Sequence, residues 1–202
     1  MMTQHLCALY QQACEIELQA FKPGNVSVYA DGHGMSADDF LISAQVSSIP
    51  LCNPEYTLGE RVFYAVKATR DEVGCNTNLG IILLCAPLIL AATHLNQKIT
   101  LRQALAQELV STTIADAEWV FRAITLAAPG GLGDSSEQDV KNPATVSLIH
   151  AMQIAADKDR IALQYVTDYK DIFEFAVLRY NEKLSQWRDR RWAAVFVYAE
   201  LL

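Results

Sequence analysis

The feature that most constrains this chain is a segment, residues 74–97, that contains no Asp, Glu, Lys or Arg. Its middle part, residues 79–92, is almost wholly apolar and approaches the length of a membrane-spanning helix. Polar residues crowd both ends and Pro87 interrupts the run, so the strictly apolar part is too short to cross a bilayer comfortably. The pattern predicts a helix over residues 78–95 that is buried on all sides in a globular core.

Residues that interrupt helices are scarce, with 9 Gly and 6 Pro in 202 residues, and a hydrophobic content of 51% excludes general disorder. Apolar residues at intervals of three and four, with capping signals at Ser36–Asp39 and Thr57–Glu60, predict a series of helices. They span residues 6–20, 57–70, 78–95, 100–109 and 112–127, the last capped by Ser111 or Thr112, and residues 40–46 begin another. A loop covers residues 50–54, a helix start lies at Asn142–Pro143, and the chain from there to Leu202 holds two or three helices. We therefore expect an all-α, single-domain multi-helix bundle over residues 1–202, with eight or nine helices and a fully buried central helix.

The formal charge of −7 leaves no basic surplus to wrap a polyanion, so general nucleic-acid binding is disfavoured. The five cysteines form no CxxC pair, which indicates neither a disulfide framework nor a zinc ribbon. The first residues lack the basic region of a signal peptide. We expect a cytoplasmic protein that binds neither nucleic acid nor membrane.

Two long polar loops, residues 22–37 and 128–142, contain the residue types of a phosphate and metal site. The first has Lys22, Gly24 and Asn25, in which lysine supplies positive charge and glycine allows close backbone approach. The second has Gly130 and Gly131, with Asp139 after them. Neither loop matches a Walker or Rossmann pattern, so a helix end followed by an ordinary loop is an equally good interpretation.

The triplet Asn76-Thr77-Asn78 opens the uncharged helix. The N–H groups at a helix N-terminus, together with its positive dipole end, form a ready anion site. Ordinary capping by Asn or Thr is the alternative. Because two amides around a threonine exceed what a cap requires, we favour the anion site.

Several carboxylates are candidates for metal binding or acid–base chemistry. Glu17 borders the buried stripe of the first helix near Lys22, so it is either a metal or base candidate or a salt-bridge partner of Lys22. Asp116 lies in the first turn of its helix, where favourable interaction with the dipole is the simple explanation. Asp159 and Arg160 belong to a charged cluster that a surface ladder of ion pairs also explains.

His33 is the only histidine in a candidate loop, and the other histidines have no partners at ligand spacing. A histidine-bound transition metal is therefore disfavoured, and carboxylates and amides point to Mg²⁺.

The ordered motifs resemble the triphosphoribosyl-dephospho-CoA synthase family (CitG/MdcB-like), in the branch found in archaea and methylotrophic bacteria. The resemblance covers roughly residues 13–175. The matching blocks are Glu17 with residues 22–26, Asp31 and residues 39–44, residues 76–81 and 86–88, residues 116–133 with Asp139, and residues 152–165.

This resemblance implies an all-helical fold and a reaction in which ATP loses adenine. The triphosphoribosyl group passes to the 2′-hydroxyl of 3′-dephospho-CoA, or to a related coenzyme-precursor acceptor. Mg²⁺, lysine and backbone amides would bind the triphosphate, and carboxylates would stabilise an oxocarbenium-like centre. The implied catalytic residues are Glu17, Asp31 and His33, and the implied metal ligands are Asp116 and Asp139. The implied phosphate or nucleotide ligands are Lys22, Gly24, Asn25, Asn76, Thr77, Asn78, Gly130, Gly131, Asp159 and Arg160.

Two alternatives stay open: a non-catalytic nucleotide-binding or regulatory protein of the same fold, and an N-glycosidic-bond hydrolase. Relatives in this branch carry a later Asp…Arg-Lys motif that these 202 residues do not contain, so we expect a domain that lacks it. We also expect Trp192, Val195, Phe196 and Tyr198 to expose an apolar face on the last helix that supports a homodimer. A magnesium site requires Glu17, Asp31, Asn76, Asp116 and Asp139 to converge.

Overall fold

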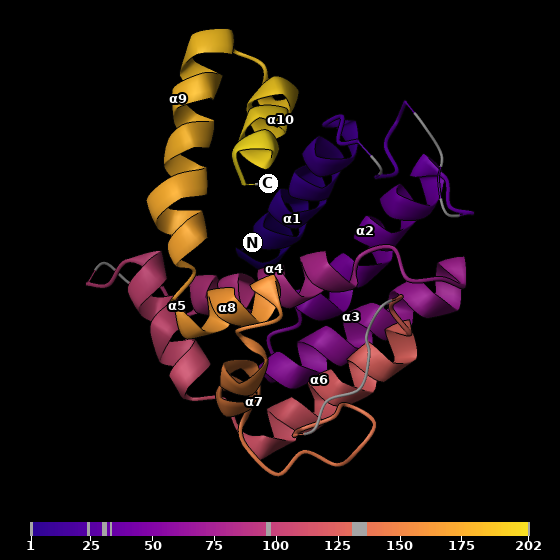
Figure 1. Cartoon of the computed structure of the whole chain (residues 1–202), viewed down its shortest axis with the longest axis vertical. Coiled ribbons are helices and arrows are strands. Elements are labelled where there is room, and N and C mark those ends of the chain that lie inside the picture. Colours follow the sequence, from indigo (N-terminus) through magenta and orange to yellow (C-terminus); the bar gives the residue numbers. More distant parts are fainter. Residues whose placement is uncertain are drawn as a thin grey trace.

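A computed structural model describes residues 2–23, 25–29, 32, 34–95, 98–130 and 137–201. Within these ranges the chain is all-α and forms no strand, and Gly32 and Met35 form an isolated bridge (Figure 1). The helices are α1 (Met2–Gln19), α2 (Ala37–Leu51), α3 (Leu58–Val73), α4 (Leu79–Thr93), α5 (Leu101–Val110), α6 (Ile114–Ala127), α7 (Leu148–Ala155), α8 (Arg160–Val166), the π-helix η1 (Asp171–Ala176), α9 (Val177–Trp187) and α10 (Arg190–Leu201). The predicted fold class is confirmed.

Capping boxes define the starts of four of these helices. The boxes predicted at Ser36–Asp39 and Thr57–Glu60 open α2 and α3. A third box opens α5, and the box of α6 uses Thr113 with Asp116. The prediction of Ser111 or Thr112 as the cap of α6 is therefore wrong by one or two residues.

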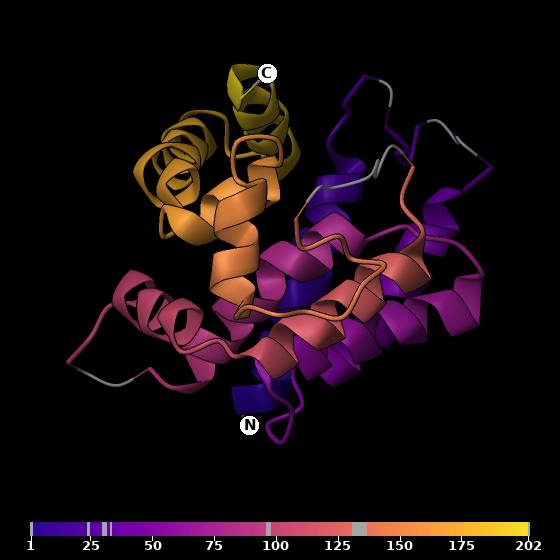
Figure 2. The ribbon, with the colours of Figure 1, turned by 60° about the horizontal axis from the view of Figure 1, so that its bottom comes forward.

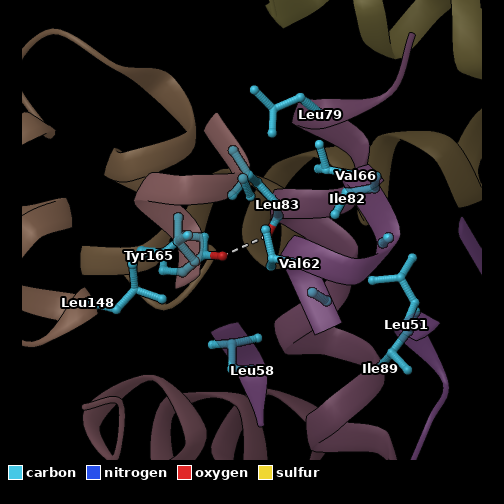
Figure 3. Close-up of a cluster of buried hydrophobic side chains, with 14 of the residues drawn as sticks. Leu51, Leu58, Val62, Val66, Leu79, Ile82, Leu83, Ile89, Leu148 and Tyr165 are labelled. Atoms are coloured by element: carbon cyan, nitrogen blue, oxygen red, sulfur yellow. Dashed lines mark hydrogen bonds between the residues drawn. The ribbon is translucent and has the colours of Figure 1, made fainter. Parts of the chain in front are cut away.

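The uncharged segment forms α4, as predicted, and lies at the centre of the bundle (Figure 1). It packs against α1, α2, α3, α5 and α8, and none of its residues is exposed. Its buried residues and those of its neighbours form one apolar cluster (Figure 3). None of the described helices combines the length and the apolar character needed to span a membrane.

Pro87 lies inside α4 and has no N–H group, so the carbonyl of Leu83 one turn earlier lacks its usual helical donor. The buried hydroxyl of Tyr165 in α8 donates to this carbonyl at 2.7 Å (Figure 3). Tyr169 donates to the next carbonyl, that of Leu84, at 3.0 Å. Burial raises the pKa of both phenols, so they remain protonated donors. The carbonyl that Pro87 leaves without a donor, together with the next one, thus links α4 by hydrogen bonds to the segment around α8.

Helices α3 and α6 cross closely at Gly59. A Cβ atom at this position would lie 2.6 Å from the Asp116 Cα and 2.7 Å from the Asp116 carbonyl oxygen. The Gly59 N–H donates to Asp116 Oδ1 at 2.9 Å. Only glycine permits this approach of two backbones.

The segment after α6 contradicts the predicted helix start at Asn142–Pro143, because α7 begins at Leu148. The main-chain N–H of Ala144 donates to Glu118 Oε2, and that of Thr145 to Gln138 Oε1. These donors are satisfied by side chains of other segments, so the chain does not need a helix here.

Residues 148–201 contain five helical segments, not the predicted two or three. Asp159 caps α8. Asp168 and Tyr169, between α8 and η1, and Arg188, at the end of α9, have left-handed φ angles of 50°, 55° and 54°. Glycine is the residue that usually adopts this region, and none of these three residues is a glycine. The sequence therefore gives no signal of these breaks. The predicted loop over residues 50–54 is also shorter, because α2 continues to Leu51.

Helices α9 and α10 form a hairpin that lies apart from α3 and α6 (upper left of Figure 2). No residue of α9 is buried, and Ala193 is the buried residue of α10. Of the four residues expected to expose an apolar face, only Trp192 is exposed, while Val195, Phe196 and Tyr198 are partly buried. The homodimer through this face remains a prediction.

Candidate functional site

A cavity of about 620 Å³ lies between α1, α9 and α10, a volume within the usual range for small-molecule sites. Most of its wall is apolar, and two tyrosines, Tyr180 and Tyr198, also face it. The apolar lining residues are Ala13, Ile16 and Ala20 of α1, Leu84 of α4, Ala176 of η1, Val177 of α9, and Ala194, Val197 and Leu201 of α10. We call this space the α1–α9–α10 cavity.

The polar lining residues are Glu17, Lys22 and Asn25, from the end of α1 and the loop after it. Lys22 is buried, and its Nζ lies 2.8 Å from Glu17 Oε1. The same ammonium donates to the main-chain carbonyl of Glu17 and, at 3.3 Å, to that of Ala20. Carbonyls at a helix C-terminus lack helical donors and attract cations, which explains why Lys22 folds back over α1.

The Glu17 side chain is 40% exposed, whereas that of Lys22 is 7% exposed. One Glu17 oxygen is therefore fixed by a buried cation, and the carboxylate still borders the cavity. The salt bridge considered from the sequence is confirmed.

Two neighbouring groups stay neutral. Burial raises the pKa of Cys14, one turn before Glu17, to about 11, and the Glu17 charge adds to the effect. Burial also raises the pKa of Tyr180. The carboxylate of Glu17 is thus the negative group of the described cavity wall.

The Asn76-Thr77-Asn78 turn fastens α4 to α2. Asn76 Oδ1 accepts from the main-chain N–H of the first residue of α4 at 3.1 Å, in the manner of a cap. Thr77 Oγ1 donates to Ser43 Oγ at 2.6 Å, and Asn78 Nδ2 donates to Ser47 Oγ at 3.2 Å. Each of the three side chains has a structural partner, and none of them lines the α1–α9–α10 cavity.

Asp116, predicted as a metal ligand, links α3 to α6. Its Oδ1 accepts from Gly59 N–H, and its Oδ2 accepts from the N–H and hydroxyl of Thr113 at 2.9 and 2.7 Å. Both oxygens are occupied by protein donors, so the contacts of Asp116 are structural.

The predicted residues of the second loop lie after α6. Asp139 is partly buried, and its Oδ1 accepts from the main-chain N–H of Lys141 at 2.9 Å. Gly130 is exposed. Neither lines the α1–α9–α10 cavity.

Arg160 has the ion-pair role that the simpler interpretation gave it, whereas Asp159 caps a helix. Asp159 Oδ1 accepts from the Ala162 N–H at 2.7 Å and caps α8. Arg160 is exposed and pairs with Asp171 at 2.9 Å. Gln164, on the same face, also donates to Asp171.

Four predicted site residues, Gly24, Asp31, His33 and Gly131, lie outside the described residues. Within the described ranges, no three His, Cys, Asp or Glu side chains gather into a potential metal site. Of the five residues expected to converge on Mg²⁺, the described part of the chain therefore brings only Glu17 to the cavity.

A family comparison decides what kind of protein has this cavity. The family model described as CitG: ATP:dephospho-CoA triphosphoribosyl transferase matches residues 3–202. The chain belongs to the CitG family. No match was found among curated proteins or among solved structures. The CitG-family match includes the Glu17–Lys22 pair and both helices of the C-terminal hairpin.

The sequence interpretation missed the contribution of α9 and α10 to this CitG-family cavity. Ala194, Val197, Tyr198 and Leu201 recur at helical spacing, and this stripe was available as a signal. It predicts an apolar face, but not which element the face packs against.

Proposed function

We propose that this CitG-family chain transfers the triphosphoribosyl group of ATP to the 2′-hydroxyl of 3′-dephospho-CoA in a Mg²⁺-dependent reaction that releases adenine. The observation that carries the proposal is the ion pair of Glu17 with buried Lys22 on the wall of an otherwise apolar cavity. The family match supports the ATP and dephospho-CoA substrates.

In this reaction the bond between C1′ and N9 of ATP breaks, and a bond forms between C1′ and the acceptor oxygen. The acceptor hydroxyl loses one proton, and the departing purine gains one. Positive charge develops at C1′ between these events, as in other glycosyl transfers. A preoriented carboxylate beside the place where this charge develops stabilises it. We assign this role to Glu17.

Lys22 was predicted to bind phosphate, and the geometry favours another role. Its ammonium has three N–H donors, and the Glu17 carboxylate and two main-chain carbonyls accept from it. We therefore propose that Lys22 orients the Glu17 carboxylate. Asn25, exposed at the cavity rim, stays a candidate for binding phosphate or nucleotide.

The fit of Mg²⁺ depends on the carboxylates available. Glu17 is the described carboxylate that lines the cavity, and Mg²⁺ is commonly held by one or two carboxylates together with substrate phosphates. The donor set would therefore fit Mg²⁺ bound to the ATP phosphates, where the ion would neutralise part of their charge. Asp31 and His33 remain candidates for the carboxylate and acid–base roles.

The test is release of free adenine from ATP, with Mg²⁺ and dephospho-CoA, measured by chromatography together with the mass of the product. We expect adenine and triphosphoribosyl-dephospho-CoA in equal amounts, and loss of both when Mg²⁺ is chelated. Adenine release that does not require an acceptor would show a hydrolase instead. Nucleotide binding with no adenine release, with any coenzyme-precursor acceptor, would show a non-catalytic protein.

A further inference from the structure

The turn between α9 and α10 and the start of α10 carry three arginines, Arg188, Arg190 and Arg191, in a protein whose net charge is −7. These arginines and one side of α1 line an open hollow of about 340 Å³. We call the three arginines and this hollow the arginine corner. The site proposed above does not use it.

Within the corner, Asp189 is already engaged. Its carboxylate accepts from the Arg191 guanidinium at 2.8 and 3.2 Å, and from the main-chain N–H groups of Arg191 and Trp192. The bond to the Arg191 side chain is the main cause that lowers the pKa of Asp189 to about 2. Asp189 thus neutralises Arg191 and caps the start of α10.

Arg188 and Arg190, in contrast, form no ion pair with any carboxylate in the described part of the chain. Glu15 of α1 is the other acidic residue that lines the hollow. The exposed guanidinium groups of Arg188 and Arg190 therefore line the same hollow as the Asp189–Arg191 ion pair. Guanidinium forks match the geometry of phosphate oxygens and bind them with charge-assisted hydrogen bonds.

The arginine corner adjoins the α1–α9–α10 cavity. Ile16 lines both spaces. Burial raises the pKa of Tyr180, a residue of the cavity wall, and the positive charge of nearby Arg190 opposes this shift. A molecule with an uncharged part and a phosphate chain can therefore occupy both spaces at once.

We infer that Arg188 and Arg190 bind the phosphate chain of a nucleotide substrate whose adjoining uncharged part lies in the α1–α9–α10 cavity. This inference rests on the proposed function. The chain is either the triphosphate of ATP or the diphosphate of the acceptor, since both present the same phosphate oxygens. The hairpin thus supplies anion-binding residues as well as an apolar wall.

The first experiment measures binding of inorganic triphosphate to the full chain by calorimetry, and so does not depend on activity. The variants are the double substitution Arg188→Gln with Arg190→Gln and, as the matched control, Arg70→Gln at an exposed position of α3. We expect at least tenfold weaker binding in the double variant and no change in the control. Quenching of Trp187 and Trp192, which flank the corner, gives a second readout. Equal affinity of wild type and double variant for triphosphate would overturn the inference.

Steady-state kinetics of the same variants identify the source of the phosphate. A KM for ATP raised at least tenfold, with little change in kcat, assigns the corner to the ATP triphosphate. The same rise in KM for dephospho-CoA assigns it to the acceptor. Unchanged KM values for both substrates would contradict the inference even in an active enzyme. If wild type released no adenine at all, the proposed function would fail, while the triphosphate titration would still decide whether the corner binds phosphate.

Discussion

The contact between α3 and α6 and the hairpin of α9 and α10 are held together in different ways. At the first, Gly59 and Asp116 bring two backbones into contact, and the surrounding residues are buried. In the hairpin, Arg179 pairs with Glu200 at 2.7 Å, and Lys183 lies 4.7 Å from the centre of the Phe196 ring. One region depends on close packing and the other on partly exposed charges and aromatic rings.

The difference matters for function, because the α1–α9–α10 cavity lies where the hairpin meets the rest of the molecule. Glu17 and Lys22 belong to the side that is anchored to the core through α1, and the opposite wall belongs to the hairpin. Regions with few buried apolar contacts open at lower free-energy cost than cores. The geometry therefore places a carboxylate paired with Lys22 opposite a wall that we expect to open at lower free-energy cost.

The largest effect is expected from Gly59→Ala in the packed region. The added Cβ would meet backbone atoms of Asp116, which cannot move aside as a side chain can, so we expect a loss of about 3 kcal/mol or more in the free energy of unfolding. Gly80→Ala is the control, because its nearest atom is the flexible Ile161 Cδ1 at 3.3 Å. The control should stay within about 1 kcal/mol of wild type in urea denaturation. Equal stability of the two variants would refute the close-packing account.

In the α1–α9–α10 cavity, Glu17→Gln removes the negative charge to which we assign transition-state stabilisation. We expect kcat for adenine release to fall about 100-fold, a loss of roughly 2.7 kcal/mol of transition-state stabilisation. Glu72→Gln, an exposed change on α3, should leave kcat unchanged. Activity of Glu17→Gln within threefold of wild type would remove Glu17 from the catalytic role.

Next in size is Tyr165→Phe, which removes the donor to the Leu83 carbonyl beside Pro87. An unsatisfied buried carbonyl costs about 2 kcal/mol. In a Pro87→Ala background, the new amide of residue 87 can donate to Leu83, so the same Tyr165→Phe change should cost at least about 1 kcal/mol less. The double-mutant cycle is measured by urea denaturation. Identical costs in the two backgrounds would show that the tyrosine does not replace the missing proline donor.

The smallest effect on global stability is expected from Arg179→Gln in the hairpin. Exposed ion pairs contribute little, so the Tm should change by less than about 2 °C. Hydrogen exchange of α9 and α10 amides should nevertheless become several-fold faster, because Arg179 joins the two helices. Lys67→Gln, which breaks an exposed pair with Asp71 inside α3, is the control and should leave the hairpin unchanged. A large drop in Tm, or unchanged exchange in the hairpin, would contradict the comparison.

The sequence was sufficient for features that depend on neighbouring residues. Ser36–Asp39 and Thr57–Glu60 predicted helix starts, because a cap acts over three residues. The uncharged run predicted α4, and the spacing of Glu17 and Lys22 across one helix end allowed their ion pair. The breaks at Asp168, Tyr169 and Arg188 escaped prediction, because left-handed non-glycine residues carry no local signal.

The candidate site was only partly predictable, because the hydrogen-bond partners of a polar side chain depend on the tertiary structure. Asn76 and Asp116 look like ligand-binding residues in isolation, yet their oxygens accept hydrogen bonds from backbone and side-chain donors within the protein.

By itself, the sequence determined an all-α chain of the CitG family, a buried central helix and a carboxylate beside a lysine, because composition, periodicity and short spacings encode these features. The tertiary structure decided that Tyr165 donates to the Leu83 carbonyl that Pro87 leaves without a helical donor. It also decided that Asp116 joins two helices, and that α9 and α10 complete the cavity next to Glu17. Those relations connect residues far apart in the chain, and packing alone selects which apolar faces and which polar groups meet.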